Sequence, residues 1–412
     1  MRTGVLRYAL VCLLLAGAVR AGASPGNGIR LGGNAGRLHP YLDLEGRYDS
    51  NVAFTDVDKS VGAFILHVRP GLTLESPGEL YAVDLKANVD WAQVMGSQSK
   101  LSRLYAESQL GLGVNRRGQV GLELTDVFRR SASIQALSLG NAVISNSNEL
   151  AVLVPFRPGG GALVTTASGG WRLETFEPFD KAQLCAPGSP GADCNPTDYA
   201  KLGYSDFTLG LESRWKFLPR TAALVQGQYF LHKPTSSAFG DDGSGVRAWL
   251  GLAGLFGAHL AGTVKGGYGD TFGTFGSGYR TWLANVEGEW LPVETTSLKL
   301  GYLHDYGADP GKASLYDSHR LYADAHTLLE GRFTGKLSAS FEHRSFVLVS
   351  GSSADLFRVE PSVEVEMARW LRAAAGYAYT KRTSKQPAGA ISPLPGFAYG
   401  KSEIYLRLTA TY

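Results

Sequence analysis

The fold class is decided by the segment Lys401–Tyr412, KSEIYLRLTATY. Ile404, Leu406, Leu408 and Ala410 alternate with mostly polar positions, so an extended chain has one apolar and one polar face here. This period of two predicts a β-strand rather than a helix. Such a strand leaves backbone donors and acceptors unpaired unless a partner lies on each side.

A matching pattern lies near the other end of the chain, where Leu42, Leu44, Gly46 and Tyr48 alternate with charged residues. Pairing of this segment with Lys401–Tyr412 would close the sheet. In lipid, a closed barrel is the only sheet that satisfies its whole backbone. The sequence therefore predicts an all-β fold, a single transmembrane antiparallel up-and-down β-barrel.

The start of the chain reads as a targeting segment. A basic beginning, an apolar run and the small residues Ala21-Gly22-Ala23 predict a secretory signal peptide over residues 1–23. Residues 24–37 would then be a short periplasmic segment and residues 38–412 the barrel. No later apolar run approaches the roughly 18–20 residues of a membrane helix. We therefore expect strands to cross the membrane, in the outer membrane of a Gram-negative cell.

Strand length separates this prediction from the alternative of a soluble β protein. Alternation extends over stretches such as Phe64–Glu75, longer than the five or six residues usual in soluble strands. Short connections, such as Ser76-Pro77-Gly78 and Asn115–Gly118, alternate with long ones, such as Glu177–Thr197 and Lys381–Gly400. Counting segments predicts about 18 strands, with short periplasmic turns and long extracellular loops.

A barrel of this size is too wide for side chains to fill, so we expect an aqueous channel lined by the polar positions. The charged candidates for the lumen are Arg47, Arg69, Lys86, Glu107, Arg214, Lys216, Glu287, Lys299, Glu342, Glu364 and Arg407. Both signs occur, which favours weak ion selectivity. Alternatively, these charges only pair with one another around the wall.

A few aromatic residues share the polar face: Tyr105, Phe230, Trp249, Tyr322 and Tyr405. Flat rings along a polar track could stack on sugars and guide a glycan, or they could only fill space near a rim. Two cysteines, Cys185 and Cys194, lie in one expected loop of an exported chain and are predicted to form a disulfide.

The sequence offers little for catalysis or for a bound cofactor. The 8 histidines are scattered without the spacing of metal ligands, and no nucleophile elbow occurs. We therefore expect no enzymatic activity, no metal and no cofactor. The net charge of +3 gives no reason to expect a nucleic-acid partner.

Three short motifs resemble the start of the type 2 family of outer-membrane β-barrel porins: Pro40-Tyr41-Leu42-Asp43-Leu44, Tyr48-Asp49-Ser50-Asn51-Val52 and Val68-Arg69-Pro70-Gly71-Leu72. Within that grouping the chain is similar to myxobacterial barrels assigned to exopolysaccharide secretion. The resemblance implies a periplasmic polysaccharide export protein as partner and identifies no catalytic residues.

We therefore expect an outer-membrane channel, surrounded by lipid, that translocates exopolysaccharide to the cell surface. The alternatives are a general diffusion porin for small polar solutes and a structural or adhesive surface barrel.

Overall fold

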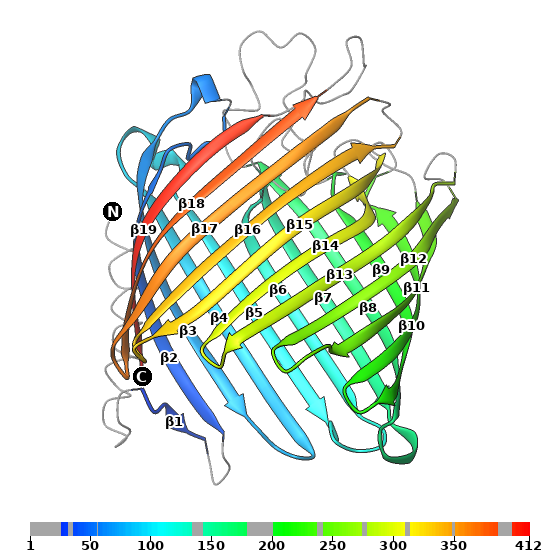
Figure 1. Ribbon diagram of the computed structural model, residues 1–412. Helices are drawn as coiled ribbons and strands as arrows, with labels where there is room; N and C mark the ends of the chain where they lie inside the picture. Colours follow the sequence, from blue (N-terminus) through cyan, green and yellow to red (C-terminus); the bar gives the residue numbers. More distant parts are fainter. Residues whose placement is uncertain are drawn as a thin grey trace.

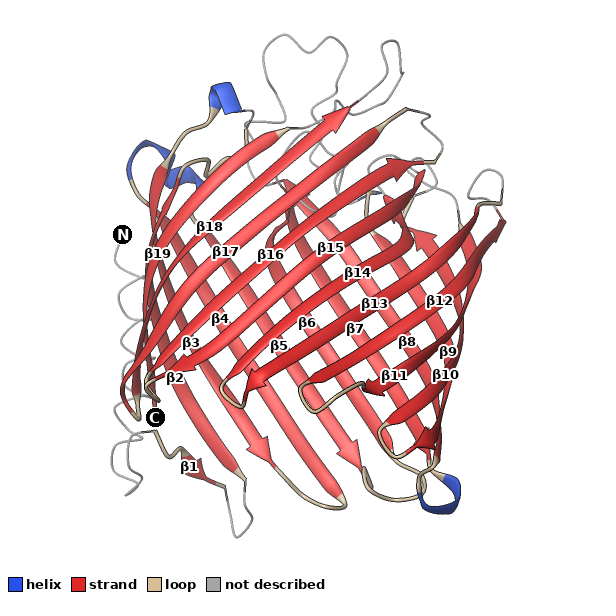
Figure 2. Ribbon diagram, in the orientation of Figure 1, coloured by secondary structure: helices blue, strands red, loops and turns tan. Residues whose placement is uncertain are grey.

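A computed structural model gives the arrangement of the chain, and its strands form one closed, tilted ring (Figures 1 and 2). The structure describes residues 26–31, 36–55, 57–133, 143–178, 201–236, 242–273, 278–309, 314–347, 351–385 and 398–412.

The strands of the ring are β2 (Arg37–Asp49), β3 (Ala63–Ser76), β4 (Tyr81–Val94), β5 (Arg103–Val114), β6 (Leu122–Ser133), β7 (Val143–Phe156), β8 (Leu163–Pro178), β9 (Tyr204–Leu218), β10 (Thr221–Pro234), β11 (Gly243–Leu255), β12 (Leu260–Gly273), β13 (Arg280–Val293), β14 (Thr296–Asp309), β15 (Ser314–Leu329), β16 (Phe333–Phe346), β17 (Ser353–Ala368), β18 (Leu371–Lys385) and β19 (Tyr399–Thr411). The remaining elements are the short strand β1 (Ile29–Arg30) and the 3-10 turns η2 (Val57–Lys59), η3 (Gly96–Leu101) and η4 (Pro158–Gly160). No helix among the described residues is long and apolar enough to cross a membrane.

The ring closes through the two predicted end strands. β19 pairs antiparallel with β2, with Leu408 opposite Leu44, and each strand from β2 to β19 pairs with its two neighbours. β1 adds only a short pairing beside β2, where Ile29 lies opposite Leu38. The predicted fold class, a closed antiparallel barrel of 18 strands, is confirmed.

The outer face of the barrel is apolar. Leu209, Leu250 and Leu406 are 65%, 65% and 68% exposed, and many other large apolar side chains share this face. A soluble protein would bury such a continuous band, whereas an outer-membrane barrel presents it to lipid. The protein is therefore an integral outer-membrane protein, as predicted.

Tight turns join the strands at one end of the barrel. Only Pro219 and Arg220 separate β9 from β10, and only Arg369 and Trp370 separate β17 from β18. Because the short turns of outer-membrane barrels are periplasmic, this end is assigned to the periplasm. Much of the chain in the long loops expected at the opposite end lies outside the described residues.

The described strands extend further toward the loop end than the sequence indicated. Residues Lys381–Gly400 were expected to form a loop, yet β18 continues to Lys385 and β19 begins at Tyr399. Polar residues continue a hairpin beyond the lipid without cost, because backbone groups there can bond either to the other strand or to water. The segments at Ala162–Thr175 and Leu260–Asp270, where glycine and alanine blur the faces, also form strands, β8 and β12.

A small apolar cluster lies at the loop end of β3 and β4. Phe54 and Leu101, from the segments that follow β2 and β4, pack with Ile65, Val94 and Tyr399. This cluster also lines a recess in the inner wall of the barrel.

Candidate functional site

The inner face of the barrel carries the candidate site. The structure places all the predicted lumen charges on this face, because each alternates with a lipid-facing residue and lies beside other inward side chains. These residues are Arg47, Arg69, Lys86, Glu107, Arg214, Lys216, Glu287, Lys299, Glu342, Glu364 and Arg407.

The most concentrated group surrounds Glu45, whose side chain is fully buried. Arg47 and Arg407 approach its carboxylate to 2.6 Å, and Arg69 approaches to 3.0 Å. The three arginines come from β2, β19 and β3, so this Glu45 cluster ties together the strands on both sides of the closure. Hydrogen bonds from charged donors compensate the desolvation of the buried carboxylate.

Further ion pairs extend the Glu45 cluster along the wall. Arg47 also bonds Glu403 at 2.8 Å, and Arg69 also pairs with Asp90 at 3.0 Å. At the loop end, the Nζ atom of Lys401 lies 2.8 Å from Asp49. Each cation of this network therefore lies against a carboxylate rather than projecting alone into the lumen.

A recess of about 650 Å³ lies in the wall beside this network. Its charged lining includes Arg69, Asp90, Lys86, Glu107 and Arg129, from β3 to β6. The apolar cluster around Phe54 and Leu101 forms another part of its lining. The recess thus offers alternating charges beside an apolar patch, a surface that suits polar solutes carrying both hydroxyl and C–H groups.

Pairing of opposite charges continues around the rest of the ring. Lys299 lies 2.8 Å from Glu287, and Glu364 lies 3.4 Å from both Lys336 and Arg372. These pairs are partly exposed, so water screens them and each is worth little in stability. Charges that pair with one another around the wall, the alternative to a selective lumen, therefore account for much of the inner face. The electric field of each such pair is confined to its surroundings.

The predicted inward aromatics show a common arrangement. Four of them lie directly opposite a glycine of the adjacent strand: Phe230 and Gly245, Trp249 and Gly267, Tyr322 and Gly301, Tyr405 and Gly376. A Cβ atom built on any of these glycines would overlap the facing ring. The rings therefore lie against the bare backbone, an arrangement known to support glycine in sheets. We refer to them as the glycine-backed rings.

Arginines lie close to two of these rings, Tyr405 and Phe230. The Cζ atoms of Arg47 and Arg407 lie 5.4 Å from the ring centre of Tyr405, and that of Arg247 lies 4.9 Å from Phe230. Tyr405 is only 7% exposed. Trp249 is partly exposed, which makes it a better candidate than Tyr405 for contact with a solute.

Tyr105 differs from the glycine-backed rings. It packs against the apolar cluster at the loop end and lines the recess. Of the two roles considered from the sequence, space filling near a rim fits this residue better than stacking on a sugar.

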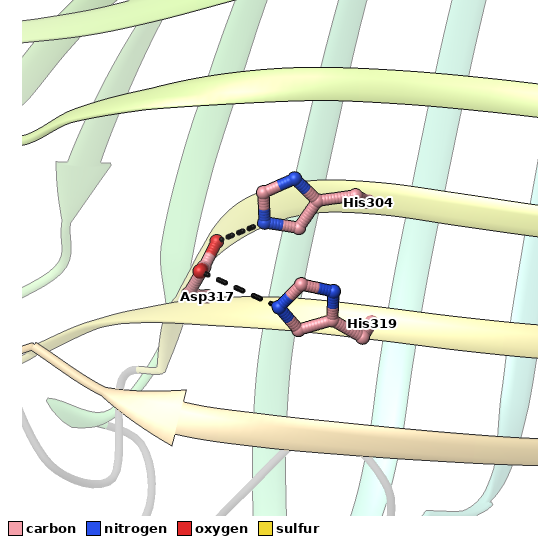
Figure 3. Close-up of side chains that lie close together, drawn as sticks. All are labelled: His304, Asp317 and His319. Atoms are coloured by element: carbon pink, nitrogen blue, oxygen red, sulfur yellow. Dashed lines mark hydrogen bonds and ion pairs between the residues drawn. The ribbon is translucent and has the colours of Figure 1, made fainter.

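One polar group was not foreseen. His304 in β14 lies directly opposite His319 in β15, and Asp317 reaches both rings from the same strand as His319 (Figure 3). The sequence signal that could have indicated this pair is the dipeptide Pro310-Gly311, which is typical of turns, because a turn predicted there would place His304 and His319 on facing strands.

Cys185 and Cys194, as well as the predicted signal peptide, lie outside the described residues. The predicted disulfide stays a prediction.

No protein-family model matches the chain, and no curated protein matches it. Among solved structures, the chain is similar to other outer-membrane barrels. OccAB4 from Acinetobacter baumannii shares 12% identity at a TM-score of 0.45, covering 94% of this chain and 100% of that one. The outer membrane protein opdK from Pseudomonas aeruginosa shares 12% identity at a TM-score of 0.43, covering 91% and 99%. The siderophore receptor PirA from Pseudomonas aeruginosa shares 8% identity at a TM-score of 0.47, covering 92% and 81%. With TM-scores below 0.5, these matches assign neither a family nor a substrate to this chain.

Proposed function

We propose that this barrel is a channel through which polar, hydroxyl-rich solutes cross the outer membrane. The observation that carries the proposal is the contrast between its two faces. Apolar side chains such as Leu406 cover the outside, whereas paired charges and the glycine-backed rings cover the inside. Paired charges stay hydrated without creating a strong field of one sign, which suits neutral or weakly charged solutes.

The more specific form of the proposal is export of exopolysaccharide, which rests on the sequence motifs near Tyr48 and Val68. A sugar polymer presents hydroxyl groups at its edges and C–H groups on its faces. The charged wall can hydrogen-bond the former, and Trp249 offers a ring for the latter. In this form, a periplasmic polysaccharide export protein delivers the polymer to the short-turn end, and residues 1–23 direct the chain to the envelope.

A general diffusion porin for small polar solutes is the second candidate. The local pairing of charges, for example Lys299 with Glu287, favours it, because such a wall discriminates weakly among solutes. A structural or adhesive barrel would need no conducting lumen, so electrical recording separates it from both transport functions.

The first experiment is planar-bilayer recording with the purified barrel. Stepwise conductance is expected, and its absence would reject both transport functions. Soluble oligosaccharides should then reduce the current through the wild-type channel, and Trp249→Ala should weaken that block. Trp290→Ala is the matched control because Trp290 lies on the lipid face, where it is 50% exposed.

The second experiment separates export from general diffusion in cells. Deletion of the gene should reduce surface polysaccharide staining if the barrel exports a polymer. Unchanged staining together with slower uptake of small solutes would instead favour the diffusion porin.

A further inference from the structure

We infer that His304, Asp317 and His319 form a binding site for a divalent transition metal ion, with Zn²⁺ as the best fit, on the outside of the barrel near its loop end. This inference does not depend on the solute that passes through the lumen.

The three residues converge because of the strand register. His304 and His319 lie opposite each other in β14 and β15, and their rings are stacked with centres 4.2 Å apart and planes 8° apart. Both rings present Nε2 toward Asp317 (Figure 3). The His304 nitrogen is 2.9 Å from one carboxylate oxygen, and the His319 nitrogen is 3.9 Å from the other.

The group faces outward. Beside it on the same faces of β14 and β15, Tyr302 lies opposite Leu321, and Leu300 follows on the apolar side. Leu300 and Leu321 are 54% and 55% exposed and belong to the lipid-facing band. Since side chains two residues apart share a face, His304 and His319 continue this face toward the loops.

The chemistry and the spacing suit a transition metal. Two imidazoles and one carboxylate form a recurrent donor set for Zn²⁺ that leaves a fourth position open. Tetrahedral coordination at about 2.0–2.2 Å places the donors about 3.3–3.5 Å apart. The three ligand atoms lie within 4.8 Å of one another, so a small movement suffices. The His319 side chain can supply this movement because it is 40% exposed.

The imidazole of His304 is buried and held in a fixed position. It is 1% exposed, and its Nδ1 has no hydrogen-bond partner among the described residues. Its Nε2, which faces Asp317, is therefore the nitrogen placed to bind an ion. The ring of Trp282, with its centre 3.9 Å from that of His304, fixes the imidazole in place.

A further histidine–carboxylate pair flanks the site. His343 in β16 lies opposite His319, so three histidines form a row across three adjacent strands. The Nδ1 atom of His343 lies 2.6 Å from Asp355 in β17. His343 therefore retains its own carboxylate partner while His304, Asp317 and His319 bind the metal.

The test is calorimetric titration of Zn²⁺ into the full barrel, stripped of metal in detergent and free of any histidine tag. We expect saturable binding of one ion per barrel, weakened at least tenfold by both His319→Gln and Asp317→Asn. Mg²⁺ should not compete, because it prefers a shell of oxygen ligands. Zn²⁺ should also raise the unfolding temperature of the wild type and leave that of His319→Gln unchanged.

His326→Gln is the matched control. His326 lies in the same strand, β15, but on the inner face and nearer the short turn. Zn²⁺ affinity should be unaffected by this change. Equal Zn²⁺ affinity in the wild type, His319→Gln and Asp317→Asn would overturn the inference, as would an equal loss in His326→Gln. Substitution of His319 avoids the risk of misfolding that attends the buried His304.

Discussion

Arg407 in β19 lies 2.6 Å from Glu45 in β2, although 362 positions separate these two residues in the chain. The contact crosses the closure of the barrel and places a buried carboxylate between strands from the two ends of the chain. Because Arg47 and Arg69 share the same carboxylate, one residue holds three strands together at the inner wall.

Substitution Glu45→Gln should lower the free energy of unfolding by about 3–5 kcal/mol, because it removes the charge that compensates three arginines in a buried position. Urea titration of the barrel in lipid vesicles measures this change. Glu107→Gln is the matched control, since Glu107 is 45% exposed and pairs with an exposed Arg129. Its cost should stay below about 1 kcal/mol.

Adding Arg407→Gln to Glu45→Gln should recover part of the lost stability, because it removes one of the uncompensated cations. If the two single changes instead add without coupling, the Glu45 cluster does not act as a unit.

Lys299 and Glu287, which form an ion pair, should influence ion selectivity in opposite directions. Both side chains are about one-third exposed, and Glu287 lies near the middle of β13 on the inner wall. Lys299→Gln should shift the reversal potential toward cation preference, and Glu287→Gln should shift it toward anion preference. Reversal potentials in a salt gradient measure both. Identical responses from the two variants would show that this pair lies outside the ion path.

Replacement of a glycine behind a ring should destabilise the barrel. Gly376→Ala places a Cβ where the Tyr405 ring lies, and Arg47 and Arg407 limit the movement of that ring. The expected cost is about 1–3 kcal/mol, as for overpacked sites. Gly288→Ala is the control, because no atom lies within 4 Å of the added carbon. That change should be neutral or slightly stabilising, and a similar loss in both variants would contradict the role of the ring.

The assignment of the two faces can be tested with neighbouring residues of β12. Val264 is 49% exposed on the lipid side, whereas Thr263 lies on the inner side opposite Glu287. Val264→Arg should cost about 2–4 kcal/mol in folding into bilayers, because it places a charge in lipid. Thr263→Arg should cost far less, since its charge faces water and a carboxylate. The reverse order would show that the faces are assigned incorrectly.

Much of the fold follows from the sequence because one residue in two must face lipid. The alternation around Leu406 and Leu44 was sufficient to predict both end strands and their pairing. The same alternation sets which residues of a strand share one face. The face of the sheet on which a residue lies follows from its position within its own strand. It does not depend on any other strand, so the local sequence determines it.

The relations between strands could not be predicted in the same way. That Glu45 meets three arginines depends on the register of β2 with β3 and β19. The pairing of Tyr405 with Gly376 depends equally on the register of β18 with β19. A shift by two residues would leave every parity unchanged and remove both contacts. The histidine pair in β14 and β15 was missed for the same reason, because only the register of these two strands brings His304 opposite His319.

The rings that lie on glycine have a consequence for the movement of a solute. A side chain that projects freely into a passage must be immobilised whenever a solute touches it, at a cost of about 0.5–1.5 kcal/mol. Trp249 is already held against Gly267 by the wall. A molecule sliding past would therefore meet a surface that is fixed in advance, with small entropic barriers between successive positions. Low friction of this kind would matter more for a long chain, which makes many contacts at once, than for a small molecule.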